Sequence, residues 1–190
     1  MKKEKLDLDD IDFEVCDARV QMGDVEEIWT TLLQKCPHGF YLSWGWVSTW
    51  LETVPSDKKI FLITGFIENK PVMSFFLGED KRIRNKFFLS HSLCLNTTGD
   101  PPLDIITVEY NTILIDPQLE LNIDRIIGQI PEKGWNELKL PGLSDEFVSR
   151  MELLNDKWLN RFNILTEQHH ESYFVDLQKI RDNGMDYDKL

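Results

Sequence analysis

One short stretch of the chain places a carboxylate, a phenol and an amide side by side, in Glu109, Tyr110 and Asn111. A second carboxylate, Asp100, lies earlier in the same loop-rich region. Such groups can line a pocket for a polar acceptor and supply a general base. They can equally hold a loop against a sheet edge by hydrogen bonds. We favour this structural role, or substrate binding, over catalysis.

Other residues with catalytic or metal-binding chemistry occur in less favourable settings. His91 lies within an apolar strand-like run, which is typical of a partly buried core histidine. In the His-His-Glu run at 169–171, adjacent ligands would point to opposite faces of an extended chain, so a turn explains it better than a metal site. No serine has a GxSxG context, so a hydrolase nucleophile is not supported at Ser43, Ser48 or Ser90.

The elements that would position these groups alternate between helices and strands. Apolar residues at helical spacing predict helices at 24–36, 43–54, 116–130 and 144–154. Asp24 with Glu27 resembles a capping box, and Ser144 is the expected cap of the last helix. Strand-like runs are found at 13–20, 60–67, 72–77, 87–95, 110–115, 135–140, 158–166 and 172–177.

This order predicts an α/β domain whose mixed sheet is covered by helices on both faces. We expect a polar leader at 1–12, a single domain at 13–178 and a polar tail at 179–190. The chain has 190 residues, enough for one domain with a full hydrophobic core.

The formal net charge of −12 argues against a nucleic acid partner, because the phosphate backbone repels an acidic protein. A compact basic run occurs at 81–86, formed by Lys81, Arg82, Arg84 and Lys86. A solvated loop explains this run better than an anion-binding turn does.

The cysteines Cys16, Cys36 and Cys94 have no metal-type spacing and suggest buried, reduced thiols. No apolar stretch approaches the ~18 residues needed to span a bilayer, and the charged start lacks a signal-peptide core. We therefore expect a cytoplasmic protein with no membrane partner.

Two segments resemble a known family. The Trp-rich stretch at 42–50 is similar to an early helix of the GNAT-fold acyltransferase-like proteins of the bacterial cellulose-biosynthesis (CelD-like) type. The loop at 98–101 and the run at 106–115 look like that family's GDP loop and IEYNGLL-like strand, with Val108 in place of Ile and Thr112 in place of Gly. The likeness covers roughly residues 40–177.

The resemblance implies a GNAT-like fold, mixed and mostly antiparallel, and an amino-terminal lobe that pairs with a second, signature-bearing lobe. GNAT enzymes hold the CoA pyrophosphate on backbone N–H groups at a glycine-rich strand-to-helix junction. The matching junction at 115–122 contains no glycine, and Pro117 removes one donor. Asp116 and Glu120 place negative charge beside Gln118, where the pyrophosphate would lie. A near-match to the phosphate loop at 125–130 ends in Ile and lies late in the helix.

Three functional hypotheses follow. The first is an acceptor-binding or structural lobe of a GNAT-like N- or O-acyltransferase that cannot hold acetyl-CoA or another acyl-CoA alone. Its partner would be a second lobe, from its own chain or another subunit, and an exposed apolar surface could also support a homodimer. The second is a non-catalytic binding module, and the third an active single-domain acyl-CoA-dependent acetyltransferase. A side-chain-filled junction favours the second, and a V-shaped split with open N–H groups favours the third.

Overall fold

The computed structural model describes residues 11–84, 86–105, 108–119, 126, 128, 130, 134–152, 163–165 and 181–182. The chain divides into two compact units, Met1–Asp156 and Lys157–Leu190. Of the second unit, residues 163–165 are exposed and 181–182 are helical. The rest of the strands predicted at 158–166 and 172–177, the His-His-Glu run, and the rest of the predicted tail lie outside the described residues.

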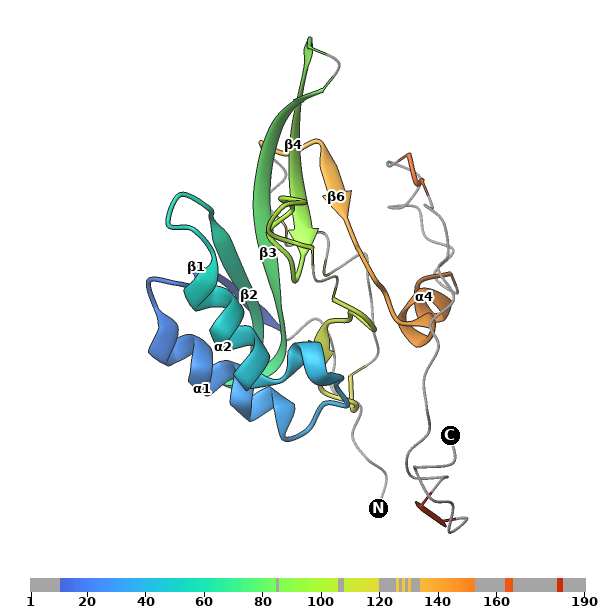
Figure 1. Cartoon of the computed structure of the whole chain (residues 1–190). Coiled ribbons are helices and arrows are strands. Elements are labelled where there is room, and N and C mark those ends of the chain that lie inside the picture. Colours follow the sequence, from blue (N-terminus) through green and yellow to red (C-terminus); the bar gives the residue numbers. More distant parts are fainter. Residues whose placement is uncertain are drawn as a thin grey trace. The chain divides into compact units, whose positions relative to one another are not determined.

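The first unit is a mixed α/β domain (Figure 1). Its elements are β1 (Asp12–Asp17), α1 (Met22–Leu33), the 3-10 helix η2 (Phe40–Leu42), α2 (Trp44–Thr53), β2 (Ile60–Ile67), β3 (Lys70–Arg84), β4 (Phe88–Leu95), β5 (Leu114–Ile115), β6 (Glu137–Lys139) and α4 (Asp145–Glu152). The strand order is β1-β2-β3-β4-β6, with β5 also paired to β3. All pairs are antiparallel except β4–β6, so the predicted mostly antiparallel mixed sheet is confirmed.

Helices α1 and α2 cover one face of this sheet (Figure 1). The predicted apolar stripe of α1 is confirmed, because Val25, Trp29 and Leu32 are all fully buried. Trp29 packs on Phe76 of β3 with ring centroids 4.5 Å apart, and its indole N–H donates to the Leu42 carbonyl at 2.8 Å. Burial of aromatic area and a satisfied indole donor together fix α1 against the sheet.

The start of α1 differs from the sequence prediction, whereas the start of α4 agrees with it. The helix begins at Met22, so Asp24 lies in the first turn rather than at the cap. The N-cap residue is Gln21, which makes no side-chain cap hydrogen bond. The predicted capping box is therefore wrong, since the chain enters the helix directly from the turn that follows β1. In contrast, Ser144 caps α4 as predicted, accepting a hydrogen bond from the Phe147 amide at 3.2 Å.

Strand β3 is far longer than the predicted 72–77 and includes most of the basic run. Its inner half pairs with β2 up to Gly78, whereas its outer half, through Arg84, pairs with β4. Lys81, Arg82 and Arg84 therefore lie on a strand, and the predicted solvated loop is wrong for these three. The loop prediction failed because a two-stranded hairpin can expose both of its faces to water. Charged side chains are therefore as compatible with it as with a loop.

Strands β4 and β5 follow one another along the same edge of β3. Leu95 at the end of β4 pairs with Leu77, and Leu114 at the start of β5 pairs with Ser74. Residues 96–113 thus leave the sheet and return to it almost where they left. Only 114–115 of the predicted strand at 110–115 is paired as strand.

Candidate functional site

Two buried asparagines pin the excursion at 96–113 to the sheet. The Asn96 side-chain oxygen accepts a hydrogen bond from the Phe76 amide at 2.9 Å, and the Asn96 amide donates to the Phe76 carbonyl at 2.9 Å. Asn96 Nδ2 donates to Asn111 Oδ1 at 2.7 Å and to the Thr112 carbonyl at 2.9 Å. Phe76 lies opposite the gap between β4 and β5, where no strand pairs with it. Asn96 supplies the hydrogen-bond partners for its backbone amide and carbonyl instead.

Asn111 extends the same network to the segment before α4. It is fully buried, and its Nδ2 donates to the carbonyls of Leu95 at 3.0 Å and Pro141 at 2.9 Å. The Asn111 amide donates to the Gly142 carbonyl at 2.7 Å, and the Asn111 carbonyl accepts from the Ser144 amide at 3.0 Å. These bonds form a parallel bridge between Asn111 and Leu143. They join the segment just before β5 to the segment between β6 and α4, so these two segments are held together at this point.

The junction that follows β5 is occupied by the chain's own carboxylate. Asp116 is 6% exposed, and its Oδ1 accepts a hydrogen bond from the Gln118 amide at 3.0 Å. The Leu119 amide donates to the Asp116 carbonyl at 2.9 Å, and Pro117 has no N–H to give. Lys35 Nζ, at 3.9 Å from Asp116 Oδ2, is the cation paired with it. These contacts form a turn at 117–119, and most of the helix predicted at 116–130, with Glu120, lies outside the described residues.

The Asp116 carboxylate also affects the thiol beside it. Burial, and secondly the charge of Asp116, raise the pKa of Cys36 to about 11. Burial likewise raises the pKa of Cys94 to about 11. Both thiols are free and buried, so they are protonated and inert at neutral pH.

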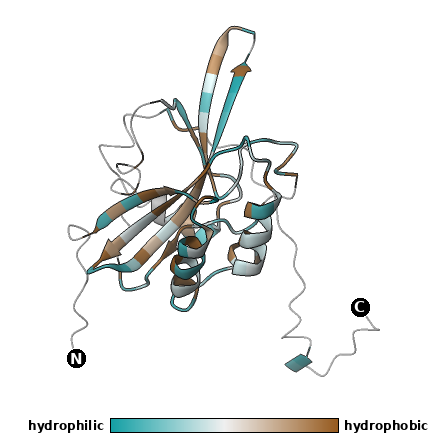
Figure 2. Ribbon diagram, turned by 90° about the vertical axis from the view of Figure 1, so that its left-hand side faces the viewer, coloured by the Kyte–Doolittle hydropathy of each residue, from teal (hydrophilic) through white to brown (hydrophobic). Residues whose placement is uncertain are grey.

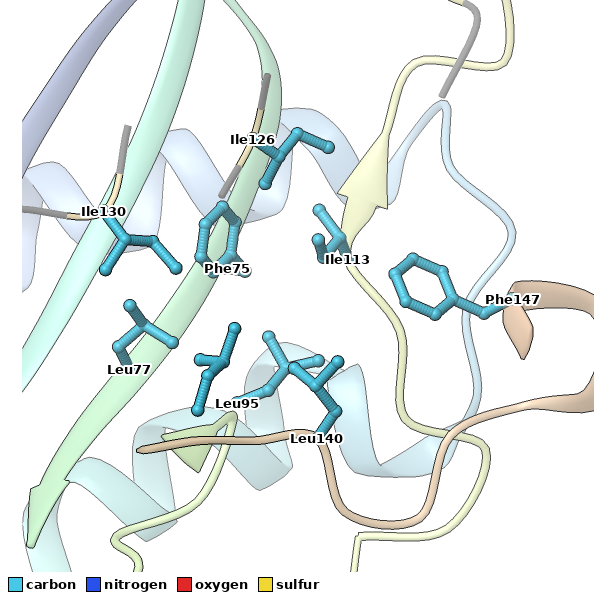
Figure 3. A pocket seen from close by; sticks show the side chains of 9 residues that line it. Phe75, Leu77, Leu95, Ile113, Ile126, Ile130, Leu140 and Phe147 are labelled. Atoms are coloured by element: carbon cyan, nitrogen blue, oxygen red, sulfur yellow. The ribbon is translucent and has the colours of Figure 1, made fainter. Parts of the chain in front are cut away.

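The space between the junction and α4 is filled by apolar side chains (Figure 3). Nine side chains surround it: Phe75, Leu77, Leu95, Ile113, Ile126, Ile130, Leu138, Leu140 and Phe147. The remaining hollow is about 20 Å³, room for about one water molecule. Phe147 of α4 and the helical Ile126 belong to this lining, so helical residues cover the second face of the sheet as predicted.

The structure separates the four predicted pocket residues. Glu109 and Tyr110 are exposed on a turn, where Tyr110 adopts the left-handed backbone conformation with φ of 55°. Asn111 is committed to the buried network just described. Asp100 is ion-paired elsewhere, with Lys58 at 2.7 Å and Arg82 at 3.5 Å. Glu109 and Tyr110 thus remain accessible to a ligand, whereas Asn111 is structural.

A polar cluster that sequence reasoning missed lies where β4 meets β6. Glu137 Oε2 accepts hydrogen bonds from Ser92 at 2.5 Å, Ser90 at 3.1 Å and Arg84 at 2.9 Å, with Lys139 Nζ at 3.5 Å. Burial opposes ionisation of Glu137, but the two serine hydrogen bonds and the two cations outweigh it and lower its pKa. The carboxylate is therefore ionised at neutral pH, and its lowered pKa makes it a weaker proton acceptor than a free glutamate side chain.

On the opposite face of the same strands, Glu79 contacts a histidine and a lysine side chain. Its Oε1 lies 2.6 Å from His91 Nε2 and 2.7 Å from Lys81 Nζ. Burial works against ionisation of Glu79, yet the Lys81 hydrogen bond and charge lower the Glu79 pKa. The His91 side chain is 17% exposed, which confirms the predicted partly buried position.

The described part of the chain shows neither a cluster of three or more metal-ligating side chains nor a helix long and apolar enough to cross a membrane.

Comparisons with known proteins return structural likeness alone. No family model matches the sequence, and no curated protein matches it. An aminoglycoside acetyltransferase from an uncultured soil metagenomic sample is 10% identical with a TM-score of 0.48, over 87% of this chain and 99% of that one. A predicted acetyltransferase from Clostridium acetobutylicum, solved with acetyl-CoA, is 8% identical with a TM-score of 0.44, over 89% and 97% of the two chains.

A possible acetyltransferase from Clostridium difficile is 12% identical with a TM-score of 0.44, over 86% of this chain and 99% of that one. All of these TM-scores lie below 0.5, so we take the function from the chain's own residues.

Proposed function

We propose that this chain is an acceptor-binding or structural lobe of a GNAT-type N- or O-acyltransferase and does not hold acyl-CoA by itself. The element order of the first unit agrees with the family that the sequence resembles. The observation that carries the proposal is the occupied junction after β5. Acyl-CoA requires free backbone N–H groups there, and this chain offers a carboxylate instead.

The first three positions after Asp116 give no free donor for a pyrophosphate. Pro117 lacks an N–H, and the Gln118 and Leu119 amides already donate to Asp116. An incoming pyrophosphate would have to displace the Asp116 carboxylate and lie against its charge. The formal net charge of −12 opposes the approach of the same polyanion from a distance.

In the complete enzyme, a second lobe would supply the acyl-CoA, from this chain's own continuation or from another subunit. The acyl carbon would pass from the thioester sulfur to an acceptor amine or hydroxyl. The acceptor proton would leave with the CoA thiolate as free thiol. The Glu109–Tyr110 turn is exposed and polar, which suits the hydroxyl or amine of a polar metabolite or saccharide.

A non-catalytic binding module on the same fold is the second candidate. The apolar filling between the junction and α4 favours it, because about 20 Å³ leaves no room for a pantetheine arm. Both candidates predict that the isolated chain does not bind acyl-CoA. They differ in whether an acyl-transferring lobe gains activity when this chain is added.

Calorimetric titration of the purified 190-residue chain with acetyl-CoA and with CoA tests the proposal. We expect no binding heat and no thermal shift at millimolar cofactor. Micromolar binding would contradict the proposal and identify an active single-domain acetyltransferase with an unusual cofactor loop.

A further inference from the structure

The outer end of the β3–β4 hairpin carries a concentration of exposed apolar side chains. Ile83, Phe87, Phe88 and Leu89 are 72%, 85%, 68% and 65% exposed. We call these four residues the hairpin tip. Figure 2 shows that both strands of this hairpin end in hydrophobic segments, beyond the hydrophilic stretch nearer the sheet. Exposed apolar groups of this density on a soluble domain mark an interaction site.

The tip projects beyond the other strands of the sheet (Figure 1). β2 pairs with β3 only as far as Gly78, and β6 pairs with β4 only at Ser92 and beyond. The ribbon from Asp80 to Arg84 therefore extends about 13 Å, at about 3.4 Å per residue, past the last position paired with β6.

Apolar side chains occupy both faces of the ribbon. Ile83 and Leu89 pair directly across the strands and share one face, while Phe88 pairs with Arg84 and lies on the other. Phe87 lies in the turn between the strands. A groove on a partner protein would cover one face and leave the other in water. A fluid apolar phase that surrounds the ribbon can bury both.

On the β4 edge of the ribbon, two backbone groups near the tip have a side-chain partner, whereas pairing of the β3 edge with β2 ends at Gly78. Outer-edge polar groups of β4 are satisfied by Asn136, whose Nδ2 donates to the Leu89 carbonyl at 3.1 Å. Asn136 Oδ1 accepts from the His91 amide at 3.0 Å. An apolar phase tolerates backbone only when its polar groups are paired. The same contacts block the addition of a strand from a second copy along this edge.

Of the four cations near the tip, Lys81 and Arg82 are paired with the carboxylates of Glu79 and Asp80. Residues 81–90 contain two lysines and two arginines and no carboxylate. Arg84 is balanced by Glu137 at 2.9 Å, whereas Lys86 makes no ion pair within the described part of the chain. Two tips meeting symmetrically would bring two Lys86 side chains together, which disfavours a tip-to-tip dimer. A lipid phosphate complements Lys86.

From these observations we infer that the hairpin tip inserts into the interfacial region of an anionic lipid bilayer. Phe87, Phe88, Ile83 and Leu89 enter the headgroup–acyl boundary, and Lys86 remains at the phosphates by extending its side chain outward. The absence of a spanning segment, from which the sequence predicted no membrane partner, does not bear on so shallow an insertion. The inference is independent of acyl transfer.

Cosedimentation with vesicles of mixed phosphatidylcholine and phosphatidylglycerol tests this inference on the full chain. We expect the wild type to sediment with the vesicles and the double variant Phe87→Ser/Phe88→Ser to partition at least tenfold more weakly. Lys86→Glu should weaken partition to the mixed vesicles several-fold, with little effect on vesicles of phosphatidylcholine alone.

Phe40→Ser is the matched control, because Phe40 is 69% exposed but lies on η2. It should partition as the wild type does. All four substituted positions are exposed, and circular dichroism would verify that each variant is folded. A wild type that stays in the supernatant, or a double variant that sediments equally well, overturns the inference. Self-association that the Phe87→Ser/Phe88→Ser variant abolishes, without vesicle binding, assigns the tip to a second copy instead.

Discussion

At the scale of single residues, the buried amide of Asn111 is the feature on which the site depends most. Its side chain satisfies one donor and two backbone acceptors that belong to two segments of the chain, at 95–96 and at 141. Few polar residues are so completely enclosed, and each of their partners would be left unpaired in water-free surroundings if the amide were removed.

Asn111→Ala should lower the free energy of unfolding by about 3 kcal/mol or more, because the Leu95 and Pro141 carbonyls and the Asn96 amide lose their partner. Urea denaturation followed by circular dichroism measures the change. Gln118→Ala removes an exposed amide nearby and should change stability by about 0.5 kcal/mol or less. Equal effects of the two substitutions would refute the central role of Asn111.

Glu137 makes the free energy of unfolding depend on pH. Its pKa in the folded protein is lowered from the ordinary value of 4.5, so its contribution is complete above that value and disappears as pH falls through the lowered pKa. Its side chain is 31% exposed, so we expect Glu137→Gln to cost only about 1 kcal/mol at pH 7. Urea denaturation across pH should show this difference vanishing in acid.

Glu52→Gln, at an exposed position of α2, is the matched control for the loss of one carboxylate. A stability difference between wild type and Glu137→Gln that persists unchanged into strong acid would disprove the assigned role of the Ser90 and Ser92 hydrogen bonds.

The two buried thiols should be almost unreactive in the folded protein. With the pKa of Cys36 and of Cys94 at about 11, the thiolate fraction near pH 8 is about a hundredfold below that of a free cysteine. Alkylation by iodoacetamide, measured for each peptide by mass spectrometry, should be slower by at least this factor than in denaturant. Rapid native labelling of Cys36 would show that the Asp116 junction opens readily.

At the scale of secondary-structure elements, the excursion at 96–113 lies directly against β3. A side-chain carbon added at Gly78 would come within 2.1 Å of the Thr97 carbonyl oxygen and 2.7 Å of the Thr98 Cα. Both are backbone atoms, which cannot move away as a flexible side chain could. Close approach of two backbones is therefore the reason that β3 carries glycine at this position.

Gly78→Ala should destabilise the protein by about 3 kcal/mol, because the excursion or the β3–β4 pairing must shift to admit one methyl group. Gly45→Ala is the control: nothing lies within 4 Å of the added carbon, and the position is helical. It should leave the melting temperature unchanged or raise it by a few degrees. Thermal unfolding of both variants compares them, and a neutral Gly78→Ala would contradict the close packing described.

The elements that sequence predicted well are those set by local periodicity. The stripe through Val25, Trp29 and Leu32 repeats at helical spacing, and Ser144 has the side chain that a cap requires. The strand register could not be predicted in this way. The placement of Asn96 opposite Phe76, and of Glu137 beside Ser92, depends on which strands pair and where. Nor could the ion pair of Asp100 with Lys58 be predicted, because the two residues lie far apart in the sequence.

At the scale of the whole molecule, the acidic domain body contrasts with the apolar hairpin tip. The body is acidic, with its strand-to-helix junction occupied by Asp116 and its second face filled by apolar side chains. The hairpin tip is apolar and locally basic. We therefore propose that the molecule is adapted to interact through its surface, at the Glu109–Tyr110 turn and at the hairpin tip, and not to enclose a large anionic cofactor.

The amide NMR spectrum of the isotope-labelled chain, recorded during titration with acetyl-CoA, tests the central claim most directly. The account predicts that the amide signals of Leu114, Ile115, Asp116, Gln118 and Leu119 stay in place at millimolar cofactor, since their N–H groups and the adjacent carboxylate leave no phosphate site. Saturable shifts confined to these residues would show that the junction receives the cofactor and would contradict the account.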